Sequence, residues 1–250
     1  MPLPVSDTSP GADSIMTFLE GYRSLRMITD STIETSALIP RFSKMLEIYS
    51  EIKEKTADLQ LRAAPQYNIF QILGLQRSEV RTHSAFLRDL LSPTGNHGQG
   101  LLFLQSFLEN CLRTFPDTFP SLPEFTIENA SNWLVSSEEH THLGRMDIVI
   151  QNPQEGFLCV VENKVDATEG WAQLERYGRW MREHHDVYPI SVLCFLTIDG
   201  DISRTAGDFP YISLSYHHDI AGWLEGILDQ IQAPGVLAVV HQYQAIAVSL

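Results

Sequence analysis

Two carboxylates and one lysine stand on two apolar segments that a short polar turn joins. Asp147 lies within residues 144–152, and Glu162 and Lys164 stand at the end of residues 157–164. A hard divalent cation prefers oxygen ligands, so two neighbouring carboxylates are a suitable donor pair for it. These residue types and their spacing therefore indicate a metal site with an adjacent positive charge.

The alternation of side chains predicts that both segments are β-strands. Met146, Ile148 and Ile150 alternate with the residues between them, which is the period of a half-buried strand. The turn between the segments contains Pro and Gly. If the two strands pair as a hairpin, Asp147 returns close to Glu162. Lys164 then shares a face with Glu162, because strand residues two apart point the same way.

This arrangement resembles the PD-(D/E)XK nuclease superfamily, in which an Asp on one strand precedes Glu-x-Lys at the end of the next. The likeness continues in Gln173 and Tyr177, which stand four residues apart on one face of a predicted helix. A Gln-x-x-x-Tyr helix is typical of RecB-like members of the superfamily. One departure is that Met146 stands where the superfamily name has Pro, but that Pro is not a ligand.

The resemblance covers residues 67 to 243. Upstream, residues 77–87 and 97–100 are similar to the helical lead-in of one bacterial branch of such nucleases, whose members are often uncharacterised or defence-associated. Downstream, residues 196–200 and 212–216 also fit that branch. The implied fold is α/β: a restriction-endonuclease-like core with a central mixed β-sheet flanked by helices, plus an N-terminal helical extension.

The periodicity of apolar residues and the positions of Pro, Gly and helix-capping residues predict the domain organisation and the secondary-structure elements. We expect a disordered lead at 1–14, a helical extension at 15–66 and a nuclease-like domain at 67–250. The predicted helices are about 15–27, 39–61, 78–91, 99–115, 168–185, 219–232 and 236–248. The predicted strands, besides the motif hairpin, are near 125–128, 133–138, 190–197 and 211–214.

The resemblance implies a role for each residue of the motif. Asp147 and Glu162 would hold Mg²⁺, for which Mn²⁺ would substitute, with the carbonyl of Asn163 as a further ligand. Lys164 would orient the attacking water or stabilise charge on the phosphoryl group. The alternative is that Glu162 and Lys164 merely pair at the end of a strand.

Four further residues have both a functional and a structural interpretation. Gln173 and Tyr177 would reach toward the metal-bound water or a phosphate, or else pack a helix on the sheet. Glu79 would add an acidic ligand from the preceding helix, or interact with that helix's dipole in its first turn. His83, four residues on, would contact the substrate, or be a core or capping histidine.

A zinc site is the main rival for the metal chemistry. His140 and His142 have strand spacing and stand beside Glu138 and Glu139, but no third ligand with suitable spacing is present. A zinc metalloprotein is therefore disfavoured, and Glu138 or Glu139 remains a candidate acidic neighbour of Asp147. The chain also has no Gly-rich phosphate loop of an ATPase.

The net charge of −14 is unusual for a protein that binds a polyanion. We therefore expect a local cationic groove that includes Arg145, Arg176 and Arg179. The expected substrate is DNA in preference to RNA, and a protein partner that delivers it, or a homodimer, remains open. The alternative function is a nucleic-acid or protein interaction module on the same fold, with weak or lost catalysis.

Composition places the chain in a broad class. Its apolar content of 44% and charged content of 19% are ordinary for a globular protein. No apolar stretch is long enough to cross a membrane, and the N-terminus has no signal-peptide pattern. The three cysteines, Cys111, Cys159 and Cys194, lack ligand spacing, so we expect buried thiols and a cytoplasmic protein.

Overall fold

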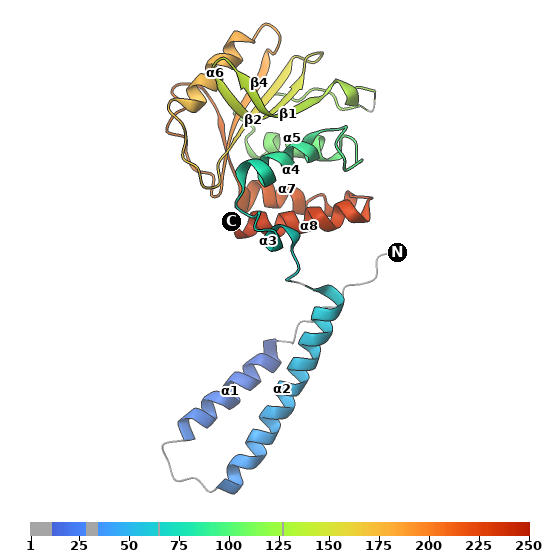
Figure 1. The fold of residues 1–250 in the computed structure, drawn as a ribbon, viewed down its shortest axis with the longest axis vertical. Coiled ribbons are helices and arrows are strands. Elements are labelled where there is room, and N and C mark those ends of the chain that lie inside the picture. Colours follow the sequence, from blue (N-terminus) through green and yellow to red (C-terminus); the bar gives the residue numbers. More distant parts are fainter. Residues whose placement is uncertain (1–11, 29–34, 65, 127) are drawn as a thin grey trace. The chain divides into compact units, whose positions relative to one another are not determined.

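The computed structural model describes residues 12–28, 35–64, 66–126 and 128–250 (Figure 1). Contacts divide the chain into two units, Met1–Asn68 and Ile69–Leu250. Each unit is described separately below.

The first unit is a pair of helices. Helix α1 spans Ala12–Ile28 and helix α2 spans Thr35–Ala63, and Phe18 contacts Tyr49 between them with ring centroids 6.4 Å apart. Both helices are longer than the apolar spacing predicts. Residues 12–14 of the expected disordered lead belong to α1, and the rest of that lead lies outside the described residues.

The second unit contains a five-stranded mixed sheet in the order β1-β2-β3-β4-β5. The strands are β1 Leu134–Thr141, β2 Gly144–Asn152, β3 Phe157–Asn163, β4 Ile190–Thr197 and β5 Ile212–Ser215. The first three pair antiparallel, while β3, β4 and β5 pair in parallel. The fold class predicted from the sequence is confirmed.

The strand predicted near 125–128 is wrong for the residues described there. Asn129 Oδ1 accepts a hydrogen bond from the Thr126 amide at 2.9 Å, and Thr126 Oγ1 accepts one from the Asn129 amide at 3.2 Å. Short polar side chains that bond nearby backbone groups compete with strand pairing. These bonds close a turn, and Phe125 stacks on Trp133 instead of extending the sheet.

Helices cover both faces of the sheet (Figure 1). They are α3 Ile69–Ile72, α4 Ala85–Leu91, α5 Leu102–Thr114, α6 Gln173–Glu183, α7 Ala221–Glu225 and α8 Pro234–Ser249. Short helical turns are η1 Glu79–Ser84, η2 Ala130–Asn132, η3 Tyr216–Ile220 and η4 Leu228–Gln230. Helix α6 packs on one face, and α4, α5, α7 and α8 pack on the other.

The central strand β3 is buried along its whole length. Its odd-numbered residues, such as Cys159, face the layer of α4, α5, α7 and α8, and Val160 faces α6. A strand covered on both faces is an apolar run, as residues 157–161 are. Glu162 follows the parity of Val160 and therefore lies on the α6 face. No helix of the described ranges is both long and apolar enough to cross a membrane.

Candidate active site

The pairing of β2 with β3 brings the two carboxylates of the motif together. Ile148 pairs with Val161 and Asn152 with Phe157, so the same register places Asp147 opposite Glu162. Asp147 Oδ2 accepts a hydrogen bond from the main-chain N–H of Asn163 at 2.9 Å. The hairpin predicted from the sequence is confirmed.

Glu162 has no exposed surface, and only one of its two carboxylate oxygens has a hydrogen-bond partner in the described part of the chain. Its Oε1 lies 2.6 Å from Lys164 Nζ and accepts a hydrogen bond from Gln173 Nε2 at 2.5 Å, whereas its Oε2 has no partner among the described residues. Burial, followed by the nearby charge of Asp147, raises the pKa of Glu162 to about 8. Burial also raises the pKa of Asp147. The buried pair therefore lacks positive charge, even with Lys164 present.

Lys164 supplies a positive charge in direct contact with Glu162. Its side chain is 15% exposed, and burial acts to lower its pKa. The charge of Glu162 and its hydrogen bond outweigh burial, so the pKa of Lys164 is raised. The ammonium thus stays charged at neutral pH beside the carboxylates.

The first two turns of α6 tie that helix to both motif strands. Gln173 Nε2 donates to Glu162 Oε1 and, at 2.9 Å, to the Tyr177 hydroxyl, while its Oε1 accepts from the Gly170 amide at 2.8 Å. The Tyr177 hydroxyl in turn donates to the main-chain carbonyl of Arg145. Tyr177 is 1% exposed, so its ring also packs α6 on the sheet, and burial raises its pKa.

Helix α6 begins five residues later than the sequence predicts. Ala172 adopts a left-handed conformation with φ of 44°, which an α-helix does not tolerate in its interior. The late start places Gln173 in the first turn, where its side chain can reach both Glu162 and the Gly170 amide.

Asn163 points to the opposite side of the sheet from Glu162. Its Oδ1 accepts from the Tyr216 hydroxyl at 2.8 Å and its Nδ2 donates to Ser84 Oγ at 3.1 Å, and all three side chains are buried. The side chain therefore anchors the end of β3 in the helical layer. The side chain of Asn163 is thus engaged away from Glu162, and the metal contact expected of this residue concerns its main-chain carbonyl alone.

Glu79, the first residue of η1, contacts the loop that follows β3. Its Oε1 accepts from the main-chain N–H groups of Asp166 at 3.3 Å and Ala167 at 2.9 Å, and its charge acts on Lys164. Glu79 thus holds the loop that leaves β3.

His83 is not placed where a substrate could reach it. It has no exposed surface, its Nδ1 lies 2.9 Å from the Tyr243 hydroxyl, and its Nε2 lies 3.0 Å from the carbonyl of Gln76. A carbonyl only accepts, so Nε2 carries the proton and Nδ1 accepts from Tyr243. Burial lowers the pKa of His83, which favours the neutral ring. The expected contact with substrate is therefore corrected to a role in the core.

The three arginines expected in a cationic groove differ in their partners. Arg145 Nε lies 2.8 Å from Glu138 Oε2, and Arg179 lies 4.0 Å from Glu175. Within the described part of the chain, Arg176 has no carboxylate at ion-pair distance, and its buried Nε has no hydrogen-bond partner. Arg176 is thus the arginine with most charge available for a phosphate.

Glu138 is the acidic neighbour that the sequence did not separate from Glu139. The register of β1 on β2 places Glu138 opposite Asp147, its φ is +56°, and its buried Oε1 has no hydrogen-bond partner. Glu139 instead accepts from Ser136. His142 pairs with Glu183 at 3.0 Å, and the described residues contain no cluster of three or more His, Cys, Asp or Glu side chains arranged for a metal.

The donor set nevertheless fits a divalent cation. Mg²⁺ binds through one or two carboxylates and keeps several waters, so Asp147 and Glu162 suffice. Glu162 Oε2 has no partner among the described residues and is therefore available to a cation. Burial, which raises the pKa of both carboxylates, also makes a bound cation favourable beside them.

A groove of about 980 Å³ adjoins Lys164. Two loops, residues 164–169 and 197–205, line it. Glu169 holds these loops together, accepting from Ser203 Oγ at 2.6 Å and from the Arg204 amide at 2.8 Å. Sequence reasoning missed Glu169, because a loop carboxylate without a motif gives no signal.

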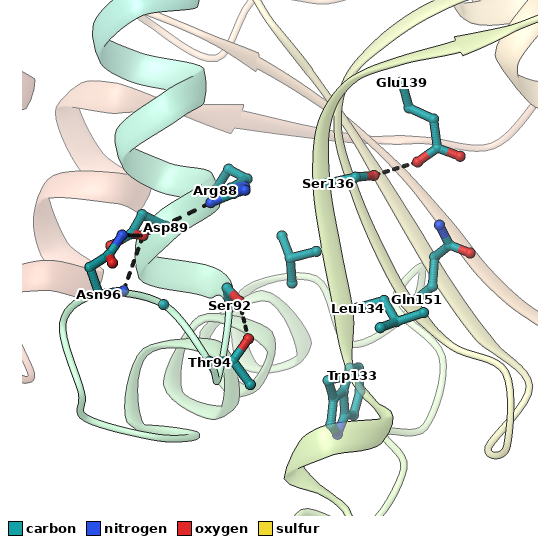
Figure 2. A pocket seen from close by; sticks show the side chains of 12 residues that line it. Arg88, Asp89, Ser92, Thr94, Asn96, Trp133, Leu134, Ser136, Glu139 and Gln151 are labelled. Carbon is teal, nitrogen blue, oxygen red and sulfur yellow. Dashed lines mark hydrogen bonds and ion pairs between the residues drawn. The ribbon is translucent and has the colours of Figure 1, made fainter.

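A second hollow, of about 400 Å³, lies between α4 and β1 (Figure 2). Its polar groups bond one another: Asp89 accepts from Asn96 at 2.9 Å, and Ser136 donates to Glu139. None of Asp147, Glu162 and Lys164 lines it. The candidate chemistry is therefore at the groove beside Lys164.

Fold and site together define a restriction-endonuclease-like α/β protein with a nuclease-type acidic centre. The family model of the PD-(D/E)XK nuclease superfamily matches residues 67–243, and the chain belongs to that superfamily. Neither the curated proteins nor the solved structures gave a match. Membership suggests nuclease-type function on a nucleic-acid substrate, and nucleases of this superfamily generally use divalent metal ions.

Proposed function

We propose that this chain is a divalent-metal-dependent nuclease that hydrolyses phosphodiester bonds, with DNA favoured over RNA. The observation that carries the proposal is the state of Glu162. This buried carboxylate lies beside Asp147, and its Oε2 has no hydrogen-bond partner among the described residues. Such a pair is costly without a cation, and a structural ion pair alone would not need the second carboxylate.

Asp147, Glu162 and the carbonyl of Asn163 are the proposed ligands of Mg²⁺ or Mn²⁺. When bound, the cation would supply a nucleophilic water at neutral pH and neutralise charge on the phosphoryl oxygens. Gln173 fixes the orientation of Glu162 through its bond to Oε1, and thereby leaves Oε2 available.

Lys164 is the proposed stabiliser of charge that develops on the phosphoryl group. Its ammonium is held at the carboxylates by Glu162 Oε1, 2.6 Å away, and opens onto the groove. A preorganised charge in a partly dry site costs no rearrangement during the reaction. Arg176 is the proposed phosphate contact, while Arg145 and Arg179 contribute less because carboxylates already partner them.

The wider assignments rest on the superfamily alone. A cytoplasmic role in phage defence or DNA processing, a partner protein that delivers substrate, and a homodimer are proposals of that kind. Glu79 is kept as a positioning residue of the loop after β3. The alternative is an interaction module with weak catalysis. The net charge of −14 supports a partner that delivers the substrate.

The test is a cleavage assay on linear, circular and single-stranded DNA, with RNA in parallel, in Mg²⁺, in Mn²⁺ and in chelator. We expect cleavage only with metal. Lys164→Ala should lower the rate about a hundredfold or more, since removing one such electrostatic contact has that effect. Asp147→Asn should act likewise, while Asp186→Asn, an exposed carboxylate beyond the far end of α6, should not.

Two results would contradict the proposal. Undiminished cleavage by Lys164→Ala would make the Glu162 pair purely structural. Nucleic-acid binding without cleavage in either metal would favour the interaction module.

A further inference from the structure

Two large apolar side chains stand exposed beside the groove. Trp171 is 86% exposed and Ile202 is 79% exposed. The other three tryptophans of the chain, Trp133, Trp180 and Trp223, are at most 8% exposed. Among the tryptophans of the chain, Trp171 is thus the one whose ring face is available to a ligand.

The exposure of these side chains is built into the fold. Glu169 accepts from Ser203 Oγ and the Arg204 amide, which joins the segment before Trp171 to the segment after Ile202. On the other side of Trp171, the Leu174 amide donates to Thr205 Oγ1 at 3.1 Å. The backbone is therefore held by hydrogen bonds on both sides of Trp171 and directly after Ile202, and little ordering is needed to present these side chains.

Their place in the chain puts them next to the proposed chemistry. Trp171 lies two residues before Gln173, whose side-chain amide donates a hydrogen bond to Glu162. Ile202 lines the groove that also contains Lys164. A nucleic acid whose phosphodiester bond lies at Lys164 and whose chain follows this groove would reach Ile202.

The groove offers little charge to hold a strand by its phosphates. Its carboxylates are Asp166, Glu169, Asp199 and Asp201, and its basic residues are Lys164 and Arg204. Lys164 is already paired with Glu162. Affinity in this groove cannot come mainly from counterion release, which needs many phosphate contacts.

We propose that Trp171, with Ile202 in the wall of the nearby groove, is a stacking site for an unpaired nucleobase, and that single-stranded nucleic acid is the substrate class. The inference rests on the proposed nuclease function. Every base has a π-face, so an aromatic platform binds single strands without sequence preference. Bases inside a duplex are already stacked on their neighbours and are not available to Trp171.

The first experiment measures binding without cleavage. Oligodeoxythymidine, or a duplex of the same length, is titrated into the metal-free protein while tryptophan emission is followed. Since the other three tryptophans are buried, quenching reports on Trp171. We expect quenching by the single strand. Because Trp171→Ala and Trp171→Phe lack this reporter, their Kd is measured by fluorescence anisotropy of a dye-labelled strand, alongside the unchanged protein. We expect a Kd about 5- to 150-fold weaker in Trp171→Ala and a smaller loss in Trp171→Phe.

Val187→Ala is the matched control, because this side chain is also apolar and 51% exposed but lies beyond the other end of α6. It should bind the single strand as the unchanged protein does. Equal binding of the single strand by Trp171→Ala, or an equal loss on single strand and duplex, would overturn the stacking site.

The second experiment separates this inference from the function on which it rests. Cleavage of single strand and duplex is compared in Mn²⁺ for the unchanged protein and Trp171→Ala. We expect the variant to lose its preference for the single strand. If the unchanged protein cleaves and the variant keeps the same preference, the stacking site alone is wrong. If the unchanged protein cleaves nothing, the nuclease proposal fails, whatever the binding titration gives.

Discussion

At the residue scale, Glu162 is a carboxylate on which burial and a neighbouring negative charge act together. It has no exposed surface, it lies opposite Asp147, and one of its oxygens has no partner. Lys164 offsets only part of this, since the pKa of Glu162 still rises to about 8. A carboxyl with such a pKa is largely protonated at neutral pH, so a metal ion must displace that proton in order to bind.

The first prediction is that metal affinity depends steeply on pH. Because Glu162 loses its proton near pH 8, Mg²⁺ or Mn²⁺ should bind about tenfold more tightly per pH unit from pH 6 to pH 8, then level off. Calorimetric titration at four pH values measures this. Glu162→Gln should bind weakly at every pH, and a pH-independent affinity in the unchanged protein would contradict the raised pKa.

The same group predicts how stability depends on pH in the metal-free protein. The folded pKa of about 8 lies above the ordinary value of 4.5, so folding favours the protonated carboxyl. The stabilisation is present in full below about pH 4.5 and is lost as pH rises to about 8. Thermal unfolding in chelator should show this decline, and Glu162→Gln should flatten it in that window.

At the element scale, the hairpin and α6 show what sequence predicts well. Two-residue alternation and a short turn fix the register, so the approach of Asp147 to Glu162 follows from local pattern. The four-residue spacing of Gln173 and Tyr177 likewise places both on one helical face. These features depend on neighbours in the chain, which the sequence displays.

Features that depend on distant partners were not predictable. The burial of His83 requires Tyr243, 160 residues away, and nothing in the local pattern indicates that contact. The start of α6 at Gln173 depends on the left-handed Ala172, a residue type that gives no such signal. The turn that the bonds between Thr126 and Asn129 close depends on short polar side chains, which compete with the strand pairing that Phe125 favours.

Helix α6 leads to the next prediction, at Gly178. A Cβ there would lie 2.4 Å from Phe209 Cγ and 2.8 Å from Phe209 Cβ, so the helix and the 209 segment would have to move apart. Alanine normally stabilises a helix relative to glycine by about 1 kcal/mol. We expect Gly178→Ala instead to lower the free energy of unfolding by about 1–3 kcal/mol, through overpacking.

Gly222 in α7 is the matched control, because a Cβ there meets no atom within 4 Å. Gly222→Ala should be neutral or slightly stabilising in the same denaturant titration. If Gly178→Ala were as stable as Gly222→Ala, the contact with Phe209 would not be tight in solution.

The helical layer that packs on β3 from the side opposite α6 gives a second element-scale test. Tyr216, at the start of η3, donates to Asn163 Oδ1, and Tyr216→Phe would leave that buried oxygen without its donor. An unsatisfied buried acceptor costs about 1–3 kcal/mol of stability. Because Asn163 stands between Glu162 and Lys164, we also expect weaker metal binding in calorimetry. Tyr67→Phe, with a ring 60% exposed, is the control that should change neither.

At the scale of the whole molecule, charge decides how a polyanion is held. The net charge is −14, and two of the three arginines beside the motif are paired with Glu138 and Glu175. The sequence shows that Arg145 and Arg179 are near the motif, but it does not show which carboxylates lie against them. Pairing across strands and along α6 therefore reduces the local positive charge that the sequence suggests.

This pairing predicts a weak dependence of binding on salt. For a single strand, log Kobs falls by about 0.7 per neutralised phosphate for each log unit of salt. Two arginines without a carboxylate partner among the described residues, Arg176 and Arg204, give a slope of about −1.4, whereas adding Arg145 and Arg179 would give about −2.8. We expect the shallower value, measured in Ca²⁺ or chelator so that little cleavage occurs.

The variant Arg176→Glu tests whether binding depends on a phosphate contact of this arginine or on the net charge of the whole protein. Arg113→Glu changes the net charge by the same two units, but Arg113 lies on α5, which covers the opposite face of the sheet from α6. Arg176→Glu should weaken binding on all sequences alike and make the slope shallower by about 0.7, because a phosphate contact carries no base information. Arg113→Glu should leave the slope unchanged. Equal effects of the two variants would mean that the acidic surface as a whole governs binding, and that the strand does not pass Arg176.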